Sequence, residues 1–358
     1  MEEKESIIAY IAFDDALSSE NGKYKVGETY KIRGAFNILS NNFRAWEFPM
    51  DAIACSFGLH IAEVEMGGEI EKSNLMSDVF SSEMTIKREL TLNEAIGISI
   101  EWLKTHDNKK YEKKVNFDEM ASCTASNESK ANIVSNGAYS KVSSNGDYSS
   151  IGLYGFASRM SSSGMVNRIV SNESFSQISS SGESPTIFSN GECTKIATSG
   201  SGGKIYATGI EAKLSTSGSG GKIYATGIEA KLSTSGSGVK IHSEGSCSRL
   251  STSGDYNTIY SYGENANIAS SGYFTSVDSS GKEAIVSCTG ANSMVKAKKG
   301  SWVTLAEWQT IVGHKKLICV KTEYVDGERI KEDTWYKLEN GEFVESNENC
   351  KMLEIRNC

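Results

Sequence analysis

An apolar residue recurs at every ninth position through the middle of the chain, without a break, from residue 133 to residue 295. The series is Ile133, Val142, Ile151, Met160, Ile169, Ile178, Ile187, Ile196, Ile205, Leu214, Ile223, Leu232, Ile241, Leu250, Ile259, Ile268, Val277, Val286 and Val295. Glycine stands four residues after each of these from Gly137 to Gly290, with the single exception of Glu173. An unbroken period of this kind predicts a solenoid, in which each repeat buries its apolar side chain against its neighbours.

The residues two before and two after each apolar position are mostly small, as around Leu214, which indicates a β-strand with one large side chain directed inward. The residue after the apolar one is large in every second repeat and small in the repeats between. The large set is Phe188, Tyr206, Tyr224, His242 and Tyr260, and the small set is Ala197, Ser215, Ser233 and Ser251. We therefore predict a mainly β fold, a two-sheet β-solenoid of 18-residue coils, each made of two nine-residue repeats. Roughly ten coils, each about 4.8 Å high, would stack in it.

One whole coil is present twice, because residues 201 to 218 recur without change as residues 219 to 236. A coil inserted there moves the two ends of the solenoid apart by one strand spacing, so a site built jointly from both ends would not survive it. The turns also lack the aspartate of calcium-binding nonapeptide repeats, whose pattern is GGxGxDxUx. We predict no metal site and no cofactor.

Residues 1–120 have the mixed pattern of a small α+β domain that precedes the solenoid of residues 121–300. We place strands at residues 7–13 and 59–66, a hairpin at residues 24–33, and helices at residues 50–57 and 92–105. The second helix follows a capping-box pattern, in which Thr91 and Glu94 satisfy backbone groups of the first turn.

Residues 301–358 predict a small β-hairpin cap at the other end of the solenoid. Asp326-Gly327 and Asn340-Gly341 are typical hairpin turns, between strands that we place at residues 317–324 and 334–338. Trp302 and Trp308 are candidates to close the open end of the core. Such caps protect a solenoid from end-to-end pairing.

The net charge is -8, with acidic residues concentrated in the two ends and a slightly basic solenoid between them. This charge distribution does not by itself indicate a nucleic-acid-binding protein. We see no basic leader and no apolar run that approaches the roughly 20 residues of a membrane span. The eight cysteines form no CxxC pair, which favours a reducing cytoplasm over a disulfide framework. We expect a cytoplasmic protein without a membrane partner.

A basic residue precedes the apolar one in seven successive repeats: Lys195, Lys204, Lys213, Lys222, Lys231, Lys240 and Arg249. Coils of two repeats divide these into two ladders on opposite faces. On the predicted binding face, Lys204, Lys222 and Lys240 stand two residues before Tyr206, Tyr224 and His242. We expect these rings to point outward beside the lysines and to bind an acidic macromolecule or a host protein, with nucleic acid as the less favoured partner.

The competing interpretation of these basic residues is structural. Long polar side chains keep a solenoid soluble and cover its apolar wall, and Glu211 and Glu229 stand where they would pair with Lys213 and Lys231.

Catalytic signals are confined to the first domain, and each has a structural interpretation that we prefer. Asp51, Cys55 and His60 lie close in sequence, but Cys55 has the helical spacing of a core residue. Glu63 and Glu65 alternate as on an exposed strand. We therefore predict no catalytic residue and no enzymatic activity.

Several motifs resemble an uncharacterised family of phage and prophage proteins, in which an α+β amino-terminal domain precedes Ser/Gly-rich repeats. The motifs are YKVGETYKIRG, HIAEVEMGGEIEKS and IKRELTLNEAI in the first domain, and SWVTLAEW with VKTEYVDGERIKEDTWYKLENGEFVE at the end. The chain departs from that family at Asn42-Phe43-Arg44, where Gly-Phe-His is usual.

The resemblance implies a phage origin and no established chemistry. It leads us to expect a non-enzymatic phage-encoded protein that binds a host macromolecule, such as a defence component, through its solenoid or its terminal domains. A structural virion component, such as a fibre or adhesin segment, is the alternative, and an enzyme seated in the first domain is a third. The oligomeric state stays open.

Overall fold

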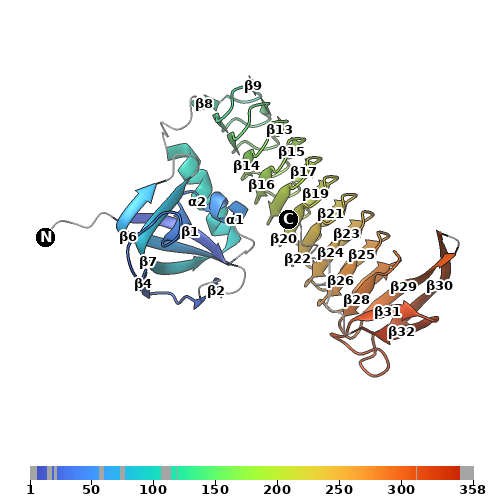
Figure 1. Cartoon of the computed structure of the whole chain (residues 1–358). Helices are drawn as coiled ribbons and strands as arrows, with labels where there is room; N and C mark the ends of the chain where they lie inside the picture. Colours follow the sequence, from blue (N-terminus) through green and yellow to red (C-terminus); the bar gives the residue numbers. More distant parts are fainter. Residues whose placement is uncertain are drawn as a thin grey trace. The chain divides into compact units, whose positions relative to one another are not determined.

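The computed structural model describes residues 6–13, 18–19, 22–55, 60–72, 77–105, 114–117, 119–311 and 313–346 (Figure 1). The chain divides into two compact units. The first holds residues 1–116 with short pieces of the first coils, and the second holds most of the chain from residue 117 onward. The predicted boundaries after residues 120 and 300 stay predictions.

The first unit is an α+β domain, as predicted. Its elements are β1 (Ile7–Phe13), β2 (Ser18–Ser19), β3 (Gly22–Lys23), β4 (Thr29–Lys31), β5 (Phe43–Trp46), α1 (Pro49–Cys55), β6 (His60–Lys72), β7 (Asp78–Leu90) and α2 (Leu92–Thr105). The antiparallel sheet has the order β4-β7-β5-β1-β6, and β7 also pairs with β6, so that four strands close into a ring. Its core includes Phe13, Val64, Met84 and Ile86.

Both predicted helices of this unit form, and the capping box is present. The Glu94 amide donates to Thr91 Oγ1 at 3.2 Å, and the Thr91 amide donates to Glu94 Oε2 at 2.8 Å. The hairpin predicted at residues 24–33 is wrong, because β4 pairs with β7 and places Tyr30 opposite Met84. The long β7 edge offers this segment a partner that the local turn pattern does not reveal.

The second unit contains the solenoid, whose coils stack in a row in Figure 1. The 13-stranded sheet consists of β8 (Lys114–Phe117), β10 (Asn132–Ser135), β12 (Ser150–Leu153), β14 (Arg168–Ser171), β16 (Thr186–Ser189), β18 (Lys204–Ala207), β20 (Lys222–Ala225), β22 (Lys240–Ser243), β24 (Thr258–Ser261), β26 (Ser276–Ser279), β28 (Met294–Ala297), β31 (Tyr336–Glu339) and β32 (Glu342–Glu345). The 12-stranded sheet consists of β9 (Cys123–Ser126), β11 (Lys141–Ser144), β13 (Arg159–Ser162), β15 (Gln177–Ser180), β17 (Lys195–Thr198), β19 (Lys213–Thr216), β21 (Lys231–Thr234), β23 (Arg249–Thr252), β25 (Asn267–Ser270), β27 (Ile285–Cys288), β29 (Trp302–Ile311) and β30 (His314–Tyr324).

The predicted coil of two nine-residue repeats is confirmed by the strand register. Ile205 pairs with Ile223 in one sheet, and Leu214 pairs with Leu232 in the other, both in parallel. These four side chains are at most 1% exposed, so the nine-residue apolar series forms the interior of the solenoid. Burying an Ile or Leu side chain in this way stabilises a fold by about 1.5–3 kcal/mol.

The C-terminal segment extends both sheets: β29 pairs with β27 in parallel, and β30, β31 and β32 add antiparallel strands. Asn340-Gly341 turns between β31 and β32, as predicted, with φ angles of 52° and 72°. The hairpin turn predicted at Asp326-Gly327 is wrong, because β30 and β31 lie in different sheets and do not pair with each other. The Asp326 carboxylate accepts backbone N–H bonds from Glu328 and Arg329.

The two tryptophans do not close the core as expected. Trp302 is 50% exposed, because Val303 takes the inward position in line with Val286. Trp308 is half-buried, and its indole N–H donates to the Thr289 carbonyl at 2.8 Å. The pairing of β29 with β27 fixes which residue points inward, and Trp302 falls on the outer face.

Excising residues 219–236 is expected to leave a folded protein that is one coil shorter, because the strand after the cut meets an identical neighbour. Small-angle scattering and thermal unfolding followed by circular dichroism would measure the length and the cooperativity. Excising only residues 219–227 is the matched control, since it moves every later strand to the opposite sheet. If both proteins fold equally well, the coil of two repeats is contradicted.

Candidate functional site: a cationic groove on the 12-stranded sheet

The structure aligns the binding face predicted from the sequence, but it buries most of the aromatic side chains there. Tyr206 stands opposite Tyr224, and Tyr224 opposite His242, as Lys204, Lys222 and Lys240 also align across β18, β20 and β22. The expectation that the tyrosines are exposed is wrong: the exposed fraction is 4% for Tyr206 and 8% for Tyr224, and His242 is half-buried.

Ring stacking along the sheet accounts for part of this burial. The ring centroids of Phe188 and Tyr206 lie 4.7 Å apart, and those of Tyr224 and His242 lie 4.5 Å apart. The Tyr224 hydroxyl donates to Glu244 at 2.5 Å, and burial together with this bond raises the pKa of Tyr224. These tyrosines thus offer little ring surface to a partner, and a role of this face in binding stays a prediction.

The opposite face presents a row of exposed cations, which we call the cationic ladder. It consists of Lys141, Arg159, Lys195, Lys213, Lys231 and Arg249, with Gln177 between Arg159 and Lys195. Successive members stand directly opposite one another across β11 to β23, about 4.8 Å apart at the backbone. The ladder therefore concentrates positive charge in a straight line.

These cations form no ion pair with any described residue. The expected pairs of Lys213 with Glu211 and of Lys231 with Glu229 are not formed. Glu211 lies in the turn before β19 with a φ of 55°, and its carboxylate accepts a bond from the Cys193 thiol at 3.9 Å. Within the part of the chain that the structure describes, the ladder residues are thus left without an ion-pair partner.

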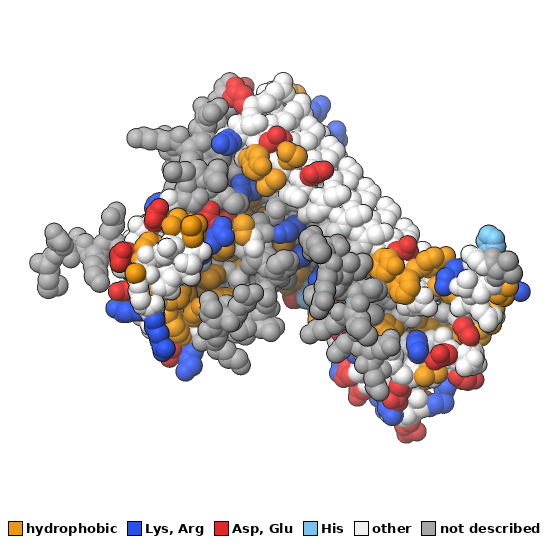
Figure 2. All heavy atoms as spheres, in the orientation of Figure 1, with side chains coloured by type: hydrophobic (Ala, Val, Ile, Leu, Met, Phe, Trp, Pro, Cys, Tyr) orange, Lys and Arg blue, Asp and Glu red, His pale blue; other side chains and the backbone are white. Residues whose placement is uncertain are grey.

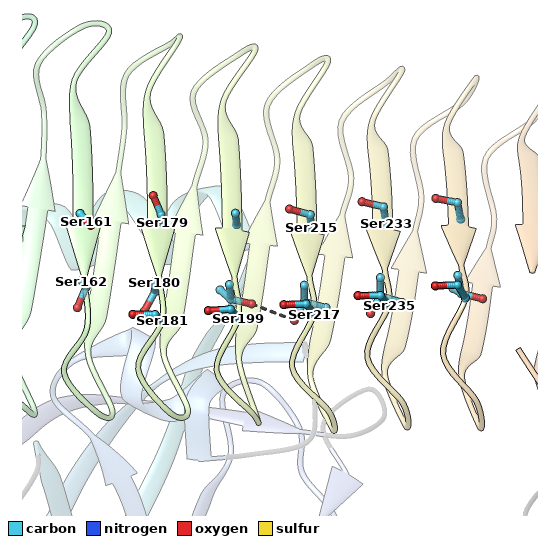
Figure 3. A pocket seen from close by; sticks show the side chains of 17 residues that line it. Ser161, Ser162, Ser179, Ser180, Ser181, Ser199, Ser215, Ser217, Ser233 and Ser235 are labelled. Carbon is cyan, nitrogen blue, oxygen red and sulfur yellow. Dashed lines mark hydrogen bonds between the residues drawn. The ribbon is translucent and has the colours of Figure 1, made fainter.

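A shallow groove runs beside the ladder, along the sheet. Its floor is a row of small outward side chains: Ser161, Ser179, Ala197, Ser215, Ser233 and Ser251. A second row of hydroxyls lies at the start of the turns, at Ser181, Ser199, Ser217, Ser235 and Ser253. Figure 3 shows both rows repeating from coil to coil, with Ser179, Ser215 and Ser233 of the floor and Ser181, Ser199, Ser217 and Ser235 of the second row labelled. The groove thus combines a flat hydroxyl-rich floor with cations along one side.

Two members of the ladder were missed by the sequence analysis. The nine-residue series of basic residues begins at Lys195 because Thr186 and Gln177 interrupt it. Counting back from Lys195 by two repeats at a time leads through Gln177 to Arg159 and Lys141, which lie on the same face. Following the sequence in steps of one 18-residue coil would therefore have identified Arg159 and Lys141 as members of the ladder.

The candidate catalytic residues of the first unit are engaged in structural contacts. Asp51 is 3% exposed and accepts a bond from the Ser77 hydroxyl at 2.7 Å. Cys55 is exposed, which corrects its assignment to the core. Glu63 and Glu65 do alternate along β6, but each forms an ion pair with a basic residue of β7.

Those two ion pairs join Glu63 to Arg88 at 3.2 Å and Glu65 to Lys87 at 2.8 Å. The hydrogen bond from Lys87 is the main cause that lowers the pKa of Glu65. Among the described residues, no cluster of three or more His, Cys, Asp or Glu side chains is arranged to hold a metal ion. No helix in the described ranges has the length and apolarity to cross a membrane.

Residues 7–98 match a family model described as a domain of unknown function (DUF7666). The matched range contains the three motifs of the first unit on which the resemblance to known proteins was based, and it leaves the solenoid outside. Comparison with curated proteins finds no match, and comparison with solved structures finds none either. Because the family is described without a function, the match assigns no activity or ligand to this chain.

Proposed function

We propose that this chain is a non-enzymatic binding protein that holds an extended acidic macromolecule along the cationic groove. The observation that carries the proposal is the line of six exposed cations that have no ion-pair partner among the described residues. Two unit charges at this spacing repel each other by about 1 kcal/mol or less in water, so the ladder stabilises nothing by itself. An anionic chain laid along it would relieve the repulsion at every coil.

The rigidity of the solenoid favours binding. Every ladder residue is carried by a strand that pairs on both sides, so the backbone positions from which the charged side chains extend are fixed before a partner arrives. A preorganised surface loses little conformational entropy when it binds. A linear partner that spans several coils would then add one contact for each coil that it covers.

The partner and the setting of this proposal follow from the expectations drawn from the sequence. An acidic macromolecule of a host cell, including an acidic host protein of a defence system, fits the groove by charge. The resemblance to phage proteins supports a phage-encoded protein acting in the host cytoplasm. A fibre or adhesin segment of a virion is the second candidate, favoured by the straight stack of in-register coils.

Reversing the charge of Lys195, Lys213 and Lys231 to glutamate is expected to weaken binding about tenfold or more and to flatten its salt dependence. Three exposed ion pairs of about 0.2–1 kcal/mol each are lost, and repulsion is added. The full chain would be titrated with oligomannuronate, poly-glutamate and oligothymidylate, and the change measured for each polymer that binds.

Lys282→Glu, Lys315→Glu and Lys316→Glu form the matched control, because these exposed lysines lie outside the groove and the net charge changes equally. An equal loss in this control indicates diffuse attraction and contradicts the proposal. The same triple change at Lys204, Lys222 and Lys240 tests the other face, and a loss confined to that variant would move the contact there.

A further inference from the structure

We infer that the acidic macromolecule is a polysaccharide that carries an acidic group on each sugar. This inference rests on the proposed function and names the class of its ligand. Three features of the groove support it: the spacing of the ladder, the chemistry of the floor, and an aromatic platform at one end of the same column.

The spacing of the cations distinguishes between linear polyanions. Neighbouring ladder residues lie one strand apart, about 4.8 Å. An extended peptide repeats its side chains on one face about every 6.7 Å, and a stacked nucleic-acid strand advances about 3.4 Å per phosphate. Both drift out of step with the ladder within a few coils.

The floor of the groove suits sugars better than bases. Each serine hydroxyl can donate one hydrogen bond and accept two, which is also the bonding capacity of a sugar hydroxyl. Proteins that hold single-stranded nucleic acid stack bases on aromatic rings along the groove. The outward positions of β11 to β25 in this sheet hold only Lys, Arg, Gln, Asn, Ser and Ala, so a base finds no ring there.

The outward column changes character at its C-terminal end. Asn267 is followed in register by Ile285, Trp302 and Tyr324, on β27, β29 and β30. Trp302 and Tyr324 are 50% and 41% exposed, and their ring centroids lie 5.1 Å apart. Figure 2 shows apolar side chains gathered toward this end of the solenoid. The C–H face of a sugar packs well on such rings, so the platform is placed to receive the end of the same polysaccharide.

The test compares length-matched probes on the full chain by titration calorimetry. Oligomannuronate is the acidic glycan, and a β-1,4-linked mannan oligosaccharide is its uncharged counterpart. Poly-glutamate and oligothymidylate represent the other two classes. We expect oligomannuronate to bind about tenfold or more tightly than either other polyanion, and the neutral glycan to bind too weakly to measure. Trp302→Ala should weaken oligomannuronate severalfold without changing the affinity for poly-glutamate, because only a sugar would pack on the exposed ring.

The outcomes separate the inference from the proposed function. If poly-glutamate or oligothymidylate binds as tightly as oligomannuronate, and the Lys195, Lys213 and Lys231 reversal abolishes that binding, the groove is a polyanion site but its ligand is not a polysaccharide. If Trp302→Ala weakens all probes equally, the platform has no role specific to sugars and the inference is overturned in that part. If no polyanion binds, both proposals fail.

Discussion

Replacing Ile223 with aspartate should destabilise the solenoid by more than about 4 kcal/mol, because the carboxylate would stand without a partner between the two sheets. Ile223 is 1% exposed and lies between Ile205 and Ile241 in the same column. The loss of the aliphatic side chain adds to the cost of burying the charge. Urea unfolding followed by circular dichroism would measure the change in the free energy of unfolding.

Two controls make this result specific to the interior. Ile223→Val removes one methyl group and should cost about 0.5–1.5 kcal/mol. Ser233→Asp places the same charge at an outward position of β21, where the effect should stay within about 0.5 kcal/mol. If Ile223→Asp behaves like Ser233→Asp, the column is not the core and the arrangement of the sheets is wrong.

Gly218→Ala is expected to disrupt the stacking of the coils, although it adds only one methyl group. A Cβ atom at residue 218 would lie 2.0 Å from the carbonyl oxygen of Gly200 and 2.5 Å from its carbon. These atoms belong to the backbone of the preceding coil and cannot rotate away. Overpacking of this kind costs about 1–3 kcal/mol, or more where the backbone has to move. The melting temperature should fall accordingly.

Gly220→Asn, two residues further along the same turn, is the matched control. Gly220 has a φ of +68° and no atom within 4 Å of its Cβ position. Asn292 holds the equivalent place in a later coil with a φ of 57°, and asparagine tolerates this conformation well. Stability should therefore change little. Equal destabilisation by both substitutions would show that backbone conformation, and not contact between coils, requires the glycine column.

The periodic part of the fold could be predicted because each coil contacts only its neighbours. The side chains of the nine-residue series fix the inward positions, and the alternation of Tyr224 with Ser233 shows that one coil takes two repeats. The ends lack a repeat, and their pairing depends on distant segments. The pairing of β4 with β7 and the outward position of Trp302 therefore could not be predicted from local turn and strand patterns.

The candidate site shows a similar division. The sequence places Lys195, Lys213 and Lys231 on one face, and the structure keeps them there. Exposure is harder to predict than direction. Tyr206 and Tyr224 occupy the outward parity of their strands, yet Tyr206 stacks on Phe188 and Tyr224 on His242, which covers part of each ring. Large rings one strand apart can therefore bury each other, and this makes the face of Lys195, Lys213 and Lys231 a better candidate for binding than the face of Lys204, Lys222 and Lys240.

Acylation of lysine side chains in the presence and absence of an acidic polymer would test the central claim most directly. The full chain would be modified with and without saturating oligomannuronate, and the extent of reaction at each lysine measured by mass spectrometry. The cationic groove predicts protection of Lys195, Lys213 and Lys231, and no change at the exposed Lys315 and Lys316. Protection at Lys315 and Lys316 instead, or equal protection of all five, would contradict it.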